Sequence, residues 1–199
     1  MVDDKRRIIH LETPLSRGEA KKLRVGDVVY VSGTIFTARD QAHLRIKSYL
    51  IEGKPLPIVL KGFPIYHAGP NALKNDGWVI AALGPTTSIR MEPYSDMVGS
   101  LEVPLIVGKG GMKSGTLNAL KKYGMVYMSA PHGCGYLGAE VVKEVENVYW
   151  IDLGIPEAMW QLKMENWGPL IVGMDSRGNN LYQEAIDKAA QILAKMYNV

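Results

Sequence analysis

Short apolar runs alternate with candidate helices through the middle of this 199-residue chain, and the alternation constrains the fold more than any other feature. Short runs rich in β-branched and aromatic residues, bounded by glycine and proline, are typical of strands. Strands that alternate with helices favour an α/β fold with a mostly parallel sheet. We predict strands at residues 28–35, 65–68, 78–83, 105–108, 126–129, 148–151, 161–165 and 170–174.

Candidate helices occupy most of the segments between these strands. Asp40 can cap a helix at residues 41–51, in which Ala42 and Ile46 share an apolar face, and Gly53 is suited to end it. Further helices are predicted at residues 88–94, 115–122, 134–144 and about 181–197. The last helix carries one apolar stripe, which we assign to the core because stripes at helical spacing usually pack there. The stripe consists of Leu181, Ala185, Ile186, Ala189, Ile192, Leu193 and Met196.

The composition is that of an ordinary globular protein, with 47% hydrophobic and 22% charged residues, and it favours a single domain over residues 1–199. The net charge of +3 comes from 23 basic and 20 acidic residues scattered along the chain, which argues against a nucleic-acid partner. The apolar runs are far shorter than the roughly 20 residues that cross a membrane. Residues 1–7 carry both charges and lead into no signal-like apolar run, so we expect a cytoplasmic protein.

The chain has one cysteine, Cys134, and therefore no internal disulfide. With four scattered histidines, it also makes a zinc site of Cys and His ligands improbable. A cubane iron–sulfur cluster usually needs three or four thiolates, so this chain cannot hold one alone. We predict no metal ligand here, and any cluster chemistry would have to use ligands from another chain.

Polar, glycine-rich segments follow three of the predicted strands, at residues 32–40, 84–91 and 108–115. Functional residues of open α/β sheets gather where strands end. Taken singly, each segment also has a structural explanation as a helix cap, a turn or a surface arginine. Together they place Arg39, Arg90 and Lys109 on three loops that could converge at one sheet edge. A dicarboxylate needs such charge-assisted donors at both of its ends.

The segment at residues 108–115 superficially resembles a phosphate-binding loop, because Lys113 and Ser114 follow several glycines. Its spacing is wrong: the two required glycine positions are occupied by Met112 and Val107. A dinucleotide fingerprint also fails, since its last glycine would fall at position 113. The sequence therefore argues against nucleotide binding.

Seven segments carry a resemblance to a known family. Three are TARDQAH at residues 37–43, GPTTSIRME at residues 84–92 and VGKGGM at residues 107–112. Four lie further along, at residues 133–134, 153–157, 168–172 and 178–181. With these motifs the chain resembles the beta subunits of class I iron–sulfur fumarate hydratases and of L-tartrate dehydratases, from about residue 13 to residue 181.

The resemblance implies a swivelling β/α domain, of the type at the carboxy-terminal end of class I fumarases. It also implies a hetero-oligomer, in which an alpha subunit holds a 4Fe-4S cluster through three cysteines and leaves one iron open to substrate. The implied activity is reversible hydration of fumarate to L-malate, a hydro-lyase reaction that needs both subunits. One alternative is dehydration of L-tartrate to oxaloacetate, and another is a non-catalytic module that binds a dicarboxylate or a protein.

The resemblance also assigns roles to individual residues. Arg39 and Arg90 would grip the substrate carboxylates, Lys109 would add positive charge, and Thr86 matches a threonine proposed as the base. Asp40 would either orient Arg39 or only cap the helix. Supporting positions around the site are Asp40, His43 and Thr87, although for His43 and His67 a structural hydrogen-bonding role is the more usual one.

Overall fold

The computed structural model describes residues 7–197, and its centre is a seven-stranded sheet. From edge to edge the order is β1 (Ile8–Glu12), β2 (Val28–Thr37), β3 (Ile65–Tyr66), β6 (Leu105–Gly108), β7 (Val126–Ser129), β9 (Met159–Met174) and β8 (Val142–Tyr149). The first five are parallel, whereas β9 runs antiparallel to its neighbours. The α/β class is confirmed, but the sheet is mixed.

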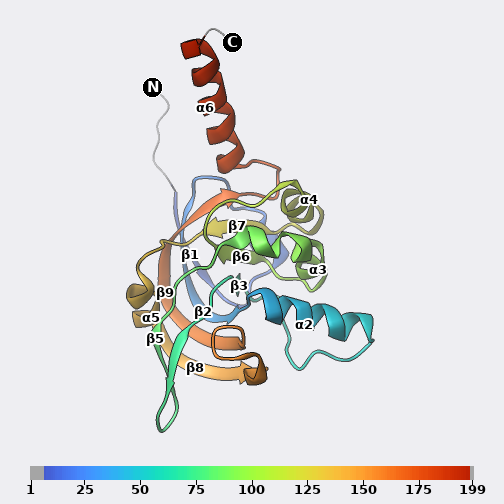
Figure 1. Cartoon of the computed structure of the whole chain (residues 1–199), viewed down its shortest axis with the longest axis vertical. Coiled ribbons are helices and arrows are strands. Elements are labelled where there is room, and N and C mark those ends of the chain that lie inside the picture. The colour runs from blue at the N-terminus through green and yellow to red at the C-terminus, as the bar shows by residue number, and fades with distance from the viewer. Residues whose placement is uncertain (1–6, 198–199) are drawn as a thin grey trace.

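Strand β9 pairs with β2 as well as with β7, so the sheet closes on itself as a barrel (Figure 1). Successive side chains of a strand point to opposite faces, and this divides the apolar residues into two clusters. Leu105 and Val107 belong to the cluster inside the barrel, while Ile106 belongs to the cluster under the helices. The helices on that side are α2 (Asp40–Ile51), α3 (Ser95–Ser100) and α4 (Ser114–Tyr123).

Other short helical elements are α1 (Arg17–Ala20) and two 3-10 helices, η1 (Ser88–Tyr94) and η2 (Ile151–Leu153). The predicted helices at residues 41–51, 88–94 and 115–122 are confirmed within one or two residues, although residues 88–94 form the tighter 3-10 type. Strand β1 was not predicted.

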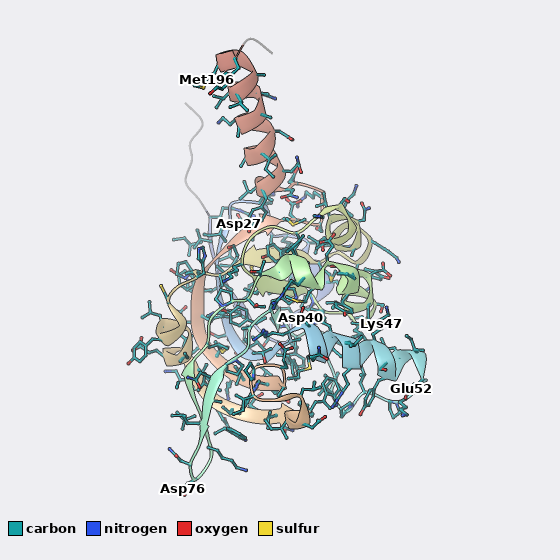
Figure 2. The ribbon with its side chains drawn as sticks, viewed as in Figure 1. Asp27, Asp40, Lys47, Glu52, Asp76 and Met196 are labelled. Atoms are coloured by element: carbon teal, nitrogen blue, oxygen red, sulfur yellow. The ribbon has the colours of Figure 1, made fainter. Side chains whose placement is uncertain are left out.

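The apolar run at residues 78–83 forms β5 (Trp78–Ala82), but β5 lies outside the large sheet. It pairs antiparallel with β4 (Asn71–Lys74), which was not predicted. The two strands form a projecting hairpin with Asp76 at its tip (Figure 2). The local turn at residues 75–77 brings β4 directly beside β5, and a local partner costs less chain entropy than a distant one.

Two further predictions are corrected in the second half of the chain. The helix expected at residues 134–144 stops early: α5 (Gly135–Glu140) is followed directly by β8, in which partly buried residues pack on the barrel core. The strands expected at residues 161–165 and 170–174 are one continuous strand, β9. Gly168 lies within it because a side chain there would come within 2.7 Å of the Val29 carbonyl oxygen on β2.

Helix α6 (Leu181–Tyr197) leaves the barrel, with Met196 near its far end (Figures 1 and 2). The expectation that its stripe packs in the core is wrong, because none of its residues is buried. Ile186 is 60% exposed and Leu193 is 58% exposed. The periodicity that predicted the stripe identifies an apolar face, but it does not say whether this chain supplies the surface that covers it.

A matched pair of substitutions tests the exposed position of this stripe. Leu193→Ala is expected to change the free energy of unfolding of the isolated chain by less than about 0.5 kcal/mol, because the leucine contacts mainly solvent. Leu120→Ala, in the buried face of α4, is expected to cost about 2 to 5 kcal/mol. Urea denaturation of the two variants checks this. Equal losses would mean that α6 packs against the domain after all.

Candidate functional site

Arg90 connects two of the predicted site residues. Its Nη2 donates a hydrogen bond of 2.9 Å to Thr86 Oγ1, and the same nitrogen lies 2.9 Å from Asp40 Oδ2. Thr86 precedes η1, Arg90 lies within it, and Asp40 is the first residue of α2 near the centre of the domain (Figure 2). The threonine hydroxyl is therefore held beside a cation, which favours negative charge on its oxygen.

Asp40 has neither of the two roles expected from the sequence. The N-cap of α2 is Arg39, without a capping side chain, and the Asp40 carboxylate pairs with Arg90 instead of Arg39. The partner of Arg39 is Glu157, whose Oε1 lies 3.0 Å from Arg39 Nε. The other oxygen, Oε2, accepts a hydrogen bond of 3.0 Å from the backbone N–H of Gln41, so Glu157 also satisfies a free donor of the first helical turn.

Lys109 and Thr87 are joined through the backbone. They form an isolated parallel bridge, and the Ser88 N–H donates to the Lys109 carbonyl over 3.2 Å. The Thr86 N–H donates to the His67 carbonyl over 2.7 Å, which ties the same loop to the end of β3. These bonds bring the segments at residues 84–91 and 108–115 together, and the Asp40–Arg90 pair adds the segment at residues 32–40.

Two buried histidines lie beneath this loop cluster. The rings of His43 and His67 are 5.3 Å apart and both residues are fully or almost fully buried. Burial lowers the pKa of His43 to about 4, and it outweighs the opposing hydrogen bond to the Arg39 carbonyl. Burial also lowers the pKa of His67 well below its usual range, with a further contribution from His43. Both rings are therefore neutral at pH 7 and support the fold.

A buried chain of hydrogen bonds connects His67 to the segment at residues 108–115, which carries Lys109. His67 Nδ1 lies 3.0 Å from Ser88 Oγ, and Ser88 Oγ lies 3.0 Å from the Tyr127 hydroxyl. That hydroxyl donates to the Gly110 carbonyl over 2.7 Å. A side chain at Gly108 would collide with Ser88 Oγ, so this packing requires glycine at the end of β6.

Glu92, the last residue of the second motif, holds the start of α4. Its carboxylate accepts hydrogen bonds of 2.9 Å from the backbone N–H groups of Lys113 and Thr116, and one of 2.6 Å from the Thr116 hydroxyl. The glycine-rich segment before α4 is thereby fixed against η1. Sequence reasoning missed the roles of Glu92 and Glu157, although both glutamates lie within the segments that carried the resemblance.

The candidate site lies at an edge of the barrel that is open to solvent. The side chains of Arg90 and Asp40 are 44% and 35% exposed. A groove lies elsewhere, between α4 and the base of α6, where Met112, Leu117, Tyr182 and Ile186 line it. The Arg90–Asp40 pair is therefore partly open to solvent.

Metal ligands do not gather within residues 7–197: no three His, Cys, Asp or Glu side chains there could hold an ion together. Cys134 is exposed, and its Sγ contacts only the His132 carbonyl oxygen among its described hydrogen-bond partners. No helix in the same range is long and apolar enough to cross a membrane.

Comparison with known proteins identifies the family. Residues 1–185 match the family model described as fumarase C-terminus, and the chain belongs to this family, as its motifs predicted. It is 48% identical to a protein of Methanocaldococcus jannaschii provisionally named L(+)-tartrate dehydratase subunit beta, over 92% of this chain and 95% of that protein. It is 44% identical to the L(+)-tartrate dehydratase subunit beta of Escherichia coli K12, over 87% and 86%.

A third relative is a longer protein of Geobacillus stearothermophilus, provisionally named fumarate hydratase class I. The identity is 42% over 94% of this chain but only 36% of that protein. Together, the family and these relatives place the chain with the beta subunits of the hydro-lyases that include L-tartrate dehydratase and class I fumarase.

Proposed function

We propose that this chain is the beta subunit of an iron–sulfur-dependent hydro-lyase acting on a dicarboxylate, and that it forms half of a site completed by a cysteine-bearing alpha subunit. The observation that carries the proposal is the Arg90 guanidinium, held between Thr86 and Asp40 at an open edge of the barrel. The fumarase-type swivelling domain belongs to the same proposal, and closure of the sheet by β9 is compatible with it.

The proposed chemistry explains why cations gather here. Removing a proton beside a carboxylate adds a second negative charge to that group, and fixed cations stabilise such charge better than mobile water does. Arg39 and Arg90 would bind the two carboxylates of the substrate through charge-assisted hydrogen bonds. Lys109 would contribute further positive charge from the end of β6. When bound to the partner, the cluster supplies a Lewis acid for departure of hydroxide.

Thr86 would take the proton from the carbon beside the carboxylate. A threonine hydroxyl is a weak base at neutral pH, so it needs a neighbour that favours the alkoxide. Arg90 is such a neighbour, because its Nη2 donates to Thr86 Oγ1 over 2.9 Å. In this arrangement the same arginine binds substrate and assists the base.

Two features support a partner chain. The candidate site is open, and the apolar stripe of α6 is uncovered in the isolated chain. A further, independent consideration is chemical: a single exposed cysteine cannot bind a 4Fe-4S cluster, so the proposal assigns the cluster to the alpha subunit.

Fumarate, hydrated to L-malate, is the substrate expected from the motifs. L-tartrate, dehydrated to oxaloacetate, is the second candidate, and the names of two beta-chain relatives favour it. The same carboxylate-binding cations would serve both substrates, since the two differ in their hydroxyl groups and share the carboxylates.

The proposal predicts activity only in a mixture. The chain is assayed under anaerobic conditions with iron and sulfide, alone and with its alpha partner, and with fumarate and L-tartrate in separate reactions. We expect turnover in the mixture and none with either subunit alone. Turnover of one substrate identifies the physiological reaction. A reconstituted mixture that converts neither substrate would contradict the proposal, and dicarboxylate binding without turnover would favour the non-catalytic module.

A further inference from the structure

The segment between β8 and β9, residues 150–158, contacts α2 along its length, and we call it the α2 clamp. The ring of Trp150 lies 5.7 Å from that of Tyr49. Further along, Asp152 binds Arg45 Nη1 through both carboxylate oxygens, at 2.7 and 2.9 Å. At the beginning of the helix, Glu157 contacts Gln41 and Arg39. The clamp therefore contacts α2 at three places along the helix, and only the contact made by Glu157 involves a candidate site residue, Arg39.

Glu157 joins an arginine and a helix start with one carboxylate. Oε1 lies 3.0 Å from Arg39 Nε and Oε2 accepts from the Gln41 N–H over 3.0 Å. The side chains of Arg39 and Glu157 are only 25% and 20% exposed, so solvent screens this pair less than an exposed one. Arg39 Nε is buried and has no hydrogen-bond partner among the described residues, so the contact with Glu157 is an ion pair. It holds the guanidinium by charge and leaves its two terminal nitrogens for another anion.

Gly69 closes the other side of Arg39. A side chain at this position would collide with the Pro156 carbonyl oxygen of the clamp. It would also lie 2.8 Å from Arg39 Cδ and 2.9 Å from Arg39 Nη1. The arginine thus passes through a narrow gap between the clamp and the backbone after β3, and the gap limits the conformations available to its side chain.

We propose that Glu157 is a positioning residue, which holds Arg39 in the orientation that receives a substrate carboxylate. This inference rests on the proposed function, because it takes Arg39 as a substrate-binding group. Glu157 acts through Arg39 and does not touch the substrate, since its own negative charge would repel a dicarboxylate. A preorganised arginine loses less freedom on binding, so the effect falls on substrate affinity.

Glu157→Gln tests the proposal in the assembled enzyme. The amide oxygen of glutamine can still accept from the Gln41 N–H, whereas the charge that fixes Arg39 is lost. We expect KM to rise about tenfold with a smaller change in kcat, because carboxylate binding is weakened in the ground state and the transition state alike. The melting temperature is expected to stay within a few degrees of the wild-type value, because the helix cap is preserved.

Asp152→Asn is the matched control. It removes the other carboxylate of the clamp that binds α2, but its partner Arg45 is not a candidate site residue. We expect an unchanged KM for this variant. Glu157→Asp keeps the charge on a shorter side chain and is expected to recover part of the affinity. Equal rises of KM in Glu157→Gln and Asp152→Asn would mean that the clamp matters only for the general position of α2.

Arg39→Ala separates failure of this inference from failure of the proposed function. If Arg39→Ala raises KM and Glu157→Gln does not, Glu157 has no positioning role, while the proposed site remains. If the wild-type mixture is inactive, the proposed function fails. The positioning role of Glu157 is then tested by NMR, which needs no enzyme turnover. The NMR signal of the Arg39 Nε–H should exchange with solvent faster in Glu157→Gln than in Asp152→Asn. Equal exchange in the two variants would overturn the inference.

Discussion

Arg90→Ala is expected to lower kcat/KM of the assembled enzyme roughly a thousandfold, equivalent to about 4 kcal/mol of lost transition-state stabilisation. The loss combines two effects, because the same guanidinium would bind a substrate carboxylate and donates to Thr86 Oγ1. Removing it would also leave the Asp40 carboxylate at the site without its cation. The uncompensated negative charge would then repel the substrate.

Arg90→Lys and Arg45→Ala complete the experiment. Lysine keeps the charge but cannot reproduce the planar fork of donors, so we expect an intermediate loss. Arg45 lies on α2 and pairs with Asp152, away from Thr86, and its replacement by alanine is expected to leave kcat/KM within about twofold. Steady-state kinetics of the three complexes, with melting curves to verify folding, provide the measurement. Normal turnover by Arg90→Ala would exclude this residue from the site.

Acidification from pH 6.5 to pH 5 is expected to destabilise the folded chain by about 1.5 kcal/mol through His43, and His67 is expected to add a loss in the same direction. Burial lowers the pKa of His43 to about 4, below its ordinary value of 6.5, and lowers that of His67 in the same direction. Between these pKa values the unfolded chain binds protons that the folded chain does not bind. The stabilising contribution is therefore complete above about pH 6.5 and is lost as the pH falls toward 4.

Urea denaturation at pH 7.5, 6.5, 5.5 and 5 measures this dependence. His43→Gln cannot take up the proton and is expected to show a shallower fall in unfolding free energy, even if the variant is less stable at every pH. His132→Gln changes an exposed histidine and is expected to keep the wild-type slope. The same slope in His43→Gln as in the wild type would mean that His43 does not carry the effect. Most carboxylates titrate below this pH window.

The motifs identified the family because they preserve residue types that the chemistry of a dicarboxylate requires. They also named residues that the structure brings together: Thr86, Arg90 and Asp40 meet through side chains, and Thr87 and Lys109 through the backbone. The specific pairings were not accessible in the same way. Asp40 was assigned to Arg39 or to the helix cap because both are its neighbours in the sequence, yet its partner is Arg90, fifty residues away.

The sequence by itself determined the strands and helices whose signal is local, the family, and the cationic chemistry of three loops. Only the tertiary structure decided that β9 closes the barrel, that α6 stands apart, and that Glu157 holds both Arg39 and the start of α2. The physical reason is the range of the interactions. Periodicity and turn propensity are properties of neighbouring residues, whereas the Gln41–Glu157 contact joins positions 116 residues apart and exists only once the sheet has formed.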